Sequence, residues 1–267
     1  MIDLLKRTFS ATSDDNIGLV AAGVAFYGFL AFVPLLAAVV LAYGLFADPV
    51  DAIGHASRVF QILPDGAARI VVDQMEAIAD TDASTAGFGL VLALGSALFG
   101  AMKGAKAVII ALNIVTGVEE PRGFLRQNGT ALLITVSLSL TALVALAAIS
   151  LLPLIESLWP GLPDILALIL RVAFWLLFGL AAAVGVALIY RFGPNAPHHH
   201  WRTLLPGALA ATGGFLIVTL AFGLFVANFG SYNATYGALG AVVVLLMWLY
   251  LSAYVLLFGA ELNVELR

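Results

Sequence analysis

The sequence predicts an all-α, polytopic membrane protein with six transmembrane helices and short amphipathic helices in its first extracytoplasmic loop. Of its 267 residues, 62% are hydrophobic and only 10% are charged, whereas a soluble chain has about 45–50% apolar and about 25% charged residues. The second observation is the uncharged stretch Ala238–Ala260, which contains 23 residues. As a helix it would extend roughly 34 Å, enough to cross a hydrocarbon core of ~30 Å. Lipid is therefore the expected solvent.

Composition also excludes several classes of site. The chain has no cysteine, so disulfides, iron–sulfur clusters and thiolate zinc sites are excluded. Its net charge of −4 is spread along the chain, without the basic stripe that a nucleic-acid partner requires. We expect no cofactor. The first apolar run is about 30 residues long, too long for a signal-peptide core of about 7–15 residues, and is expected to stay as a helix.

The expected elements follow in order. Residues 1–16 form a cytoplasmic segment with helical apolar spacing beside Lys6 and Arg7, either an amphipathic helix on the membrane surface or a solvated tail. Residues 17–267 form one transmembrane domain, with spans at about 17–46, 85–106, 130–152, 165–192, 203–229 and 238–260. Gly100 and Gly104 of the second span make a GxxxG pair, which permits a close helix contact. A polar turn over 230–237 precedes the last span.

The loop 48–84 differs from the other connections. It is rich in charges, and its apolar residues recur at helical spacing on both sides of the turn at Pro64–Gly66. This pattern predicts two short amphipathic helices, at about 50–61 and 65–80, that lie on the bilayer or dip toward it.

Lysine and arginine set the expected orientation. Three arginines lie on the face of the loop 48–84, namely Arg58, Arg69 and Arg171, against seven residues on the other face: Lys6, Arg7, Arg122, Arg126, Arg191, Arg202 and Arg267. By the positive-inside rule, both termini are cytoplasmic. The location expected is a bacterial inner membrane.

Four ordered segments carry a family resemblance. They are AAGVAFYGFLAFVPLL (21–36), ALNIVTGVEEPRGFLR (111–126), LIYRFGPN (188–195) with the Pro206–Gly207 pair, and the stretch from SYNATYG to GAELN near the end. With these segments the chain resembles the YihY/virulence factor BrkB family of bacterial inner-membrane proteins, formerly labelled ribonuclease BN. The resemblance implies six spans and cytoplasmic ends. It implies no agreed activity, and proposals for family members include transport of lipid or lipopolysaccharide precursors.

A nuclease would need clustered metal ligands. The histidines His198, His199 and His200 are adjacent in a short turn with no carboxylate nearby, so they do not predict a metal site. No nucleophile or phosphate-binding motif occurs. We therefore predict no catalytic residues and no enzymatic activity.

Polar residues near the apolar spans are better candidates, because an unpaired charge in lipid is costly. Glu261 is expected at the cytoplasmic end of the last span, at the depth of Lys103 and Lys106. It is predicted to pair with one of these lysines or with Arg122. The alternative is that these charges reach the interface separately.

Another set of residues recurs in the family motifs or lies at span ends: Tyr27, Pro34, Asn113, Tyr236 and Gly237. These residues either line a substrate cavity between spans 1, 2 and 6, or serve helix packing and turns. Pro34 is also expected to kink the first span.

These features leave three functions open. The first is a transporter or flippase for a lipid or other amphipathic substrate, with membrane lipids as partners. The second is a structural or partner-binding envelope protein. The third, a membrane-associated ribonuclease, has the least support from the residues. No pattern sets an oligomeric state.

Overall fold

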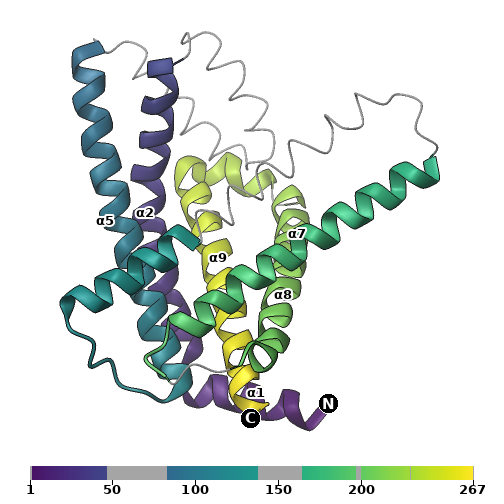
Figure 1. Ribbon diagram of the computed structural model, residues 1–267. Coiled ribbons are helices and arrows are strands. Elements are labelled where there is room, and N and C mark those ends of the chain that lie inside the picture. The colour runs from purple at the N-terminus through teal and green to yellow at the C-terminus, as the bar shows by residue number, and fades with distance from the viewer. Residues whose placement is uncertain (1, 47–82, 138–163, 197–199, 229, 267) are drawn as a thin grey trace. The chain divides into compact units, whose positions relative to one another are not determined.

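The computed structural model describes residues 2–46, 83–137, 164–196, 200–228 and 230–266. Every regular element in these ranges is a helix, which confirms the all-α prediction (Figure 1). Residues 124–137 are helical, and the other helices are α1 (Ile2–Asp14), α2 (Ile17–Phe46), α5 (Ala83–Thr116), α7 (Asp164–Phe192), α8 (Trp201–Asn228) and α9 (Gly230–Glu265).

Four helical stretches in the described part of the chain are long and apolar enough to cross a membrane. They are Leu94–Thr116, Ile165–Phe192, Trp201–Phe225 and Val242–Glu265, and Ile17–Ala31 is a shorter apolar stretch. Large apolar side chains point outward from these helices, as Leu177 does at 68% exposure, whereas many of the buried residues are alanines. Small residues inside and large apolar residues outside are typical of helices packed in lipid. The chain is thus a multi-pass membrane protein.

Two predicted regions lie outside the described residues. The loop helices expected at about 50–61 and 65–80 fall in the undescribed range 47–82, and the third expected span, 130–152, is described only to residue 137. Six spans therefore stay a prediction.

One boundary differs from the expected one. The helix of the second span runs on without a break beyond residue 106, as α5, to Thr116. The predicted turn at 230–237 is wrong, since α9 begins at Gly230 and includes it. Glycine and asparagine favour turns in water, but a chain in lipid must satisfy its backbone groups internally, and a continuous helix does this.

The described chain forms two compact units. The first contains Met1–Val20, Val108–Leu216 and Tyr254–Arg267, and the second contains Ala21–Ala107 and Ile217–Ala253.

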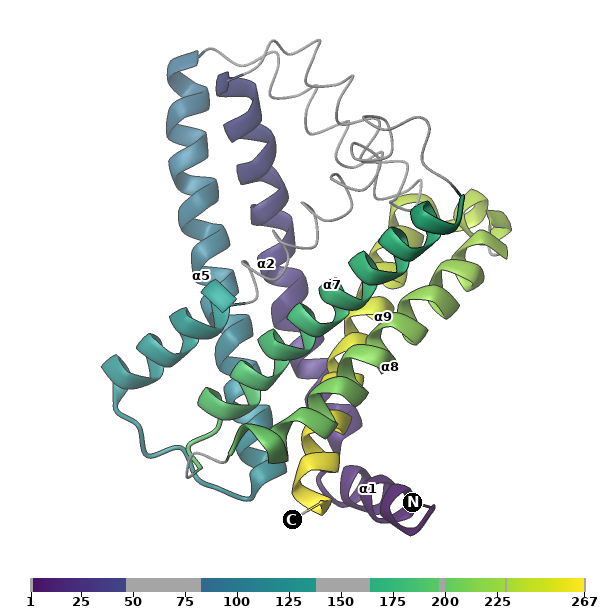
Figure 2. The same ribbon diagram turned by 45° about the vertical axis from the view of Figure 1, so that its right-hand side comes forward.

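In the first unit, the core is formed by fully buried aliphatic side chains: Ile109, Leu112, Ile134, Ile189, Leu204 and Leu257. Helix α1 lies beside the C-terminal end of α9 (Figure 2). It is joined to α2 through Asn16, whose φ of 52° lies in the left-handed region. Asparagine adopts this conformation more readily than most residues. The Asn16 carbonyl accepts a hydrogen bond from the amide of Val20 at 3.1 Å and so begins α2.

In the second unit, α2 and α5 run side by side (Figures 1 and 2). A Cβ atom at Gly100 would lie 2.8 Å from the Cα atom of Ala31, and one at Gly104 would lie 3.7 Å from the carbonyl oxygen of Tyr27. The Gly100–Gly104 pair therefore forms the close helix contact that its spacing predicts.

Candidate functional site

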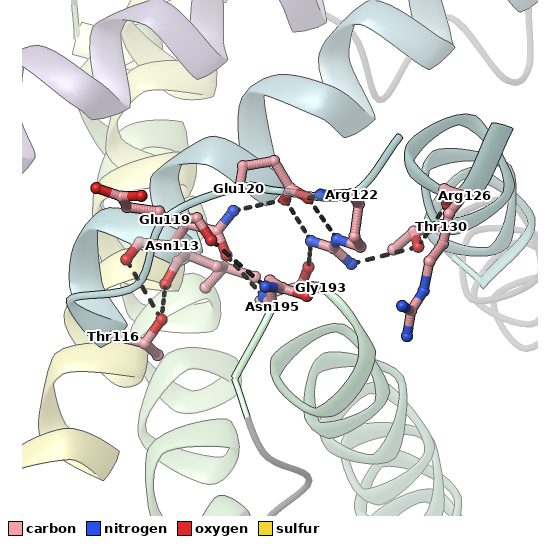
Figure 3. A network of polar contacts seen from close by, with 10 residues as sticks. Asn113, Thr116, Glu119, Glu120, Arg122, Arg126, Thr130, Gly193 and Asn195 are labelled. Atoms are coloured by element: carbon pink, nitrogen blue, oxygen red, sulfur yellow. Dashed lines mark hydrogen bonds and ion pairs between the residues drawn. The ribbon is translucent and has the colours of Figure 1, made fainter. Parts of the chain in front are cut away.

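A network of polar side chains lies at the end of α5 in the first unit (Figure 3). The buried side chain of Asn113 uses both ends of its amide. Its Nδ2 donates to Glu120 Oε2 at 2.6 Å, and its Oδ1 accepts from the backbone amide of Asn195 at 2.7 Å. Asn113 thereby ties the connector after α5 to the turn after α7.

Arg122 completes this network. Its Nε and Nη2 donate to the two carboxylate oxygens of Glu120, each at 2.5 Å. The guanidinium also donates to the Gly193 carbonyl at 2.7 Å and to Thr130 Oγ1 at 3.3 Å. Only 5% of the Arg122 side chain is exposed. A two-point arginine–carboxylate pair combines strength with fixed geometry, so the connector and the turn are held in one arrangement.

The local sequence explains why these groups meet. Gly117 ends α5 with a φ of 65°, and the Val118 amide donates back to the Asn113 carbonyl at 3.0 Å, as helix ends with a left-handed glycine do. On the other side, a Cβ atom at Gly193 would lie 2.7 Å from Leu112 Cδ1. Only glycine lets the turn after α7 come this close to α5.

The hydrogen bonds from Arg122 lower the pKa of the Glu120 carboxyl below its ordinary value of 4.5, although burial opposes this effect. Glu120 is therefore ionised at neutral pH. Because its pKa is lower in the folded state than in the unfolded chain, the ionised pair contributes stability above about pH 4.5 and loses it as pH falls further.

We expect acid to weaken the native protein more than it weakens a Glu120→Gln variant. The melting temperature of the wild type in detergent should fall as the pH drops below about 4.5, because protonation of Glu120 then removes its ion pair. Glu120→Gln should melt lower at neutral pH and show a flatter acid dependence. Glu119→Gln is the matched control, since the neighbouring Glu119 is exposed and should keep the native profile. An equal acid dependence in Glu120→Gln and wild type would contradict this assignment.

A second polar contact joins α8 and α9 within the first unit. The buried Asn263 accepts from the Gly207 amide at 2.8 Å and donates to the Leu204 carbonyl at 3.1 Å. Pro206 lies between these two backbone groups and disturbs the regular helical hydrogen bonding. Asn263 therefore binds two backbone groups of α8, one on each side of Pro206. The Tyr190 hydroxyl donates to the Leu256 carbonyl at 2.5 Å and ties α7 to the same part of α9.

Glu261 is buried, with 1% of its surface exposed. Its Oε1 has no hydrogen-bond partner among the described residues. Of its three predicted partners, Arg122 is engaged with Glu120, Thr130 and Gly193. Lys103, whose Nζ lies 5.4 Å from the centre of the Phe99 ring, belongs with Lys106 to the second unit. Pairing of Glu261 with either lysine stays a prediction.

The five predicted cavity residues divide between the units. Asn113 belongs to the first unit and the network above. Tyr27 belongs to the second unit, in α2, and is 39% exposed. Pro34 lies in α2, and Tyr236 and Gly237 lie in α9, but their side-chain surroundings are outside the description. A shared cavity stays a prediction.

The histidine turn is described only in part. His200 is exposed, and His198 and His199 lie outside the described residues. Among the residues that the structure does describe, no group of three or more His, Cys, Asp or Glu side chains has the geometry to hold a metal ion.

Sequence reasoning missed several residues of these contacts: Glu120, Gly193, Asn195 and Tyr190. Glu120 carried a readable signal, because an acid and a base separated only by Pro121 are held close by the proline. Asn195 and Tyr190 carried none, since their partners are 82 and 66 residues away along the chain.

These observations define an all-helical, multi-pass membrane protein whose connectors are locked by buried polar contacts. A family model described as virulence factor BrkB matches residues 8–267. The chain belongs to this family, as its four sequence segments indicate.

Two relatives illustrate the similarity. The putative ribonuclease-like protein YfkH of Bacillus subtilis is 33% identical over 187 residues, which cover 67% of this chain and 65% of YfkH. A UPF0761 membrane protein of Verminephrobacter eiseniae is 28% identical over 268 residues, covering 98% of this chain and 61% of that protein. The chain thus spans less than two thirds of the length of these relatives. No solved structure matches it.

Proposed function

We propose that the chain is a bacterial inner-membrane protein with six spans and cytoplasmic termini, which moves a lipid-like, amphipathic substrate with an anionic headgroup across the bilayer. Membership of a membrane-protein family and the apolar helices support the setting. The excess of lysine and arginine on one side supports the orientation.

The observation that carries the transport proposal is a pair of polar side chains exposed on the outside of apolar helices. Tyr27 of α2 and Lys103 of α5 are both exposed, and the two helices touch at the backbone of Tyr27 and Gly104. The surrounding exposed side chains include Phe26, Leu30, Leu98 and Phe99. A phenol and an ammonium on a lipid-facing surface can bind a headgroup while the substrate's acyl chains stay in lipid.

Contacts among α2, α5 and α9, the three helices predicted to line the substrate path, support this proposal. A Cβ atom at Gly28 would lie 4.0 Å from Leu249 Cδ2 of α9. In the second unit, α2 is thus in contact with both α5 and α9 around Tyr27 and Gly28.

A structural or partner-binding role is the second candidate. The tight α8–α9 contact at Gly207 and Gly259 and the fully engaged Arg122 network favour it, because they make the first unit a rigid scaffold. This role needs no substrate movement. The ribonuclease-like name of the Bacillus relative applies to that protein.

Reconstitution tests transport directly. Vesicles of phosphatidylethanolamine and phosphatidylglycerol, containing a trace of fluorescent phosphatidylglycerol, are treated with a membrane-impermeant quencher. We expect the purified protein to make more than about half of the probe accessible, since protein-free vesicles protect the inner leaflet. Tyr27→Phe and Lys103→Met should slow this exchange, because each removes a polar group from the path.

Arg126→Met is the matched control, because it removes an exposed cation that lies in the first unit. It should leave exchange unchanged. Exchange no faster than in empty vesicles, with anionic and with zwitterionic probe lipids, would favour the structural role instead.

A further inference from the structure

Helix α1 lies across the C-terminal end of α9 and not along it, as both views show (Figures 1 and 2). Both segments belong to the first unit. Helix α9 contains the apolar stretch Val242–Glu265, which is long enough to cross a membrane, so its end at Glu265 lies near the membrane surface. A helix that crosses a span at this level runs along that surface. Which of its faces meets the bilayer then depends on its rotation about its own axis.

Two contacts with α9 set this rotation. The Phe9 ring packs against the Phe258 ring with the centres 5.2 Å apart, and Arg7 Nε lies 3.5 Å from Glu265 Oε2. In α9, Phe258 precedes Glu265 by about two turns and therefore lies about 10 Å nearer the middle of the span. Phe9 and Arg7 point to nearly opposite sides of α1, about 160° apart. The Phe9 side of α1 consequently faces the bilayer, and the Arg7 side faces away from it.

The other side chains of α1 agree with this rotation. Leu5 lies one turn before Phe9 on the bilayer side, and both are exposed, Leu5 at 42% and Phe9 at 59%. Asp14 lies on the opposite side of the helix and is also exposed. Thr8 and Thr12 point between these two sides and are buried, so this third face is covered by the rest of the first unit. Apolar groups on one exposed side and a charge on the other are typical of a helix at a membrane surface.

We propose that α1 is an interfacial helix that binds the phospholipid surface around the C-terminal end of α9. Leu5 and the exposed part of Phe9 enter the boundary of the acyl chains, and water covers the opposite side, which carries Asp14. The sequence left open whether residues 1–16 lie on the membrane or form a solvated tail. The two contacts with α9 favour the membrane, because they turn the apolar side of α1 toward it.

Lys6 also fits this position. It is exposed and lies about 100° from Leu5 around the helix, at the border between the apolar side and the water side. A lysine at such a border can lay its hydrocarbon stem along apolar surface and extend its ammonium group to the lipid phosphates. The lipid contact of α1 does not require substrate transport, so it holds or fails independently of the function proposed above.

Spin labels on single cysteines test this arrangement, because the chain has no cysteine of its own. Leu5→Cys and Asp14→Cys place labels about 180° apart on α1, both at exposed positions. The full-length protein is measured in nanodiscs of phosphatidylethanolamine and phosphatidylglycerol. Collisions of each label with oxygen, which concentrates in lipid, are compared with collisions with a nickel chelate, which stays in water. Leu177→Cys, at an outward position of α7 with 68% exposure, is the reference for lipid.

We expect the oxygen-to-nickel collision ratio at Leu5→Cys to exceed that at Asp14→Cys about fivefold or more, because the apolar face of an interfacial helix lies about 5–10 Å inside the headgroup boundary. The ratio at Leu5→Cys should lie between those of Asp14→Cys and Leu177→Cys. Two further exposed positions give the same comparison if Leu5→Cys does not fold. Ser13→Cys, about 80° from Leu5, should give a higher ratio than Ser10→Cys, about 140° from Leu5.

Equal, low ratios at Leu5→Cys and Asp14→Cys show that water surrounds both sides of α1, and they overturn the proposal. Slow collisions of Leu5→Cys with both reagents overturn it as well, because protein, such as a second copy of the chain, then covers the apolar side. A low ratio at Leu5→Cys with a high ratio at Asp14→Cys contradicts the rotation of α1 set by its contacts with α9. None of these results depends on lipid exchange in the reconstituted vesicles, so failure of transport leaves this proposal standing.

Discussion

Gly207→Ala is expected to be among the most damaging single substitutions in the protein. A Cβ atom at this position of α8 would overlap the carbonyl oxygen of Gly259 and lie 2.5 Å from Asn263 Cγ. Neither neighbour can withdraw easily, since one is helix backbone and the other holds the Gly207 amide and the Leu204 carbonyl. Overpacking of this kind costs about 3 kcal/mol. For a chain of this size it should lower the melting temperature in detergent by about 6 °C or more.

The same helix supplies the control. A Cβ atom at Gly213 of α8 would meet nothing within 4 Å. Gly213→Ala should therefore be neutral, or stabilising by up to about 1 kcal/mol from its better helix propensity. If Gly207→Ala and Gly213→Ala melt at the same temperature, α8 and α9 are not in the close contact described.

Arg122→Met should have the second large effect. It leaves the Glu120 carboxylate without its cation and the Gly193 carbonyl without its donor. Removing one partner of a buried pair costs about 3–5 kcal/mol, because the remaining charge stays uncompensated. Thermal unfolding, followed by the monodisperse fraction that survives heating, measures the loss.

A double-mutant cycle separates the pair from its surroundings. The double variant Glu120→Gln/Arg122→Met should lose much less stability than the sum of the losses in the two single variants, because it contains no uncompensated charge. Arg126→Met, at an exposed position on the neighbouring helix, should change stability by less than about 0.5 kcal/mol. Simple additivity of Glu120→Gln and Arg122→Met would contradict direct pairing.

The sequence was sufficient to predict structural features that depend on a regular pattern of residues. Uncharged runs identified the helices, because lipid leaves the backbone no alternative. The spacing of Gly100 and Gly104 predicted a close helix contact, and in the structure its partner is α2. The turn expected at 230–237 was wrong because residue propensities measured in water do not apply where α9 continues as a helix.

The candidate site was only partly predictable, for a different reason. Asn113 and Arg122 were named in advance, yet their partners Gly193 and Asn195 depend on how the connector after α5 meets the turn after α7. Such pairings are tertiary and leave no local pattern. Glu261 was recognised as unusual, but its nearly complete burial depends on how the helices of the first unit pack.

The contact between Asn263 and Gly207 also bears on the order in which the protein is made. Asn263 is synthesised 56 residues after Gly207, which at 5–20 residues per second corresponds to a delay of about 3–11 s. During this interval, the backbone groups around Pro206 lack their final partner. The contact that holds the N-terminal end of α8 against α9 can therefore form only after the last turns of α9 have been synthesised.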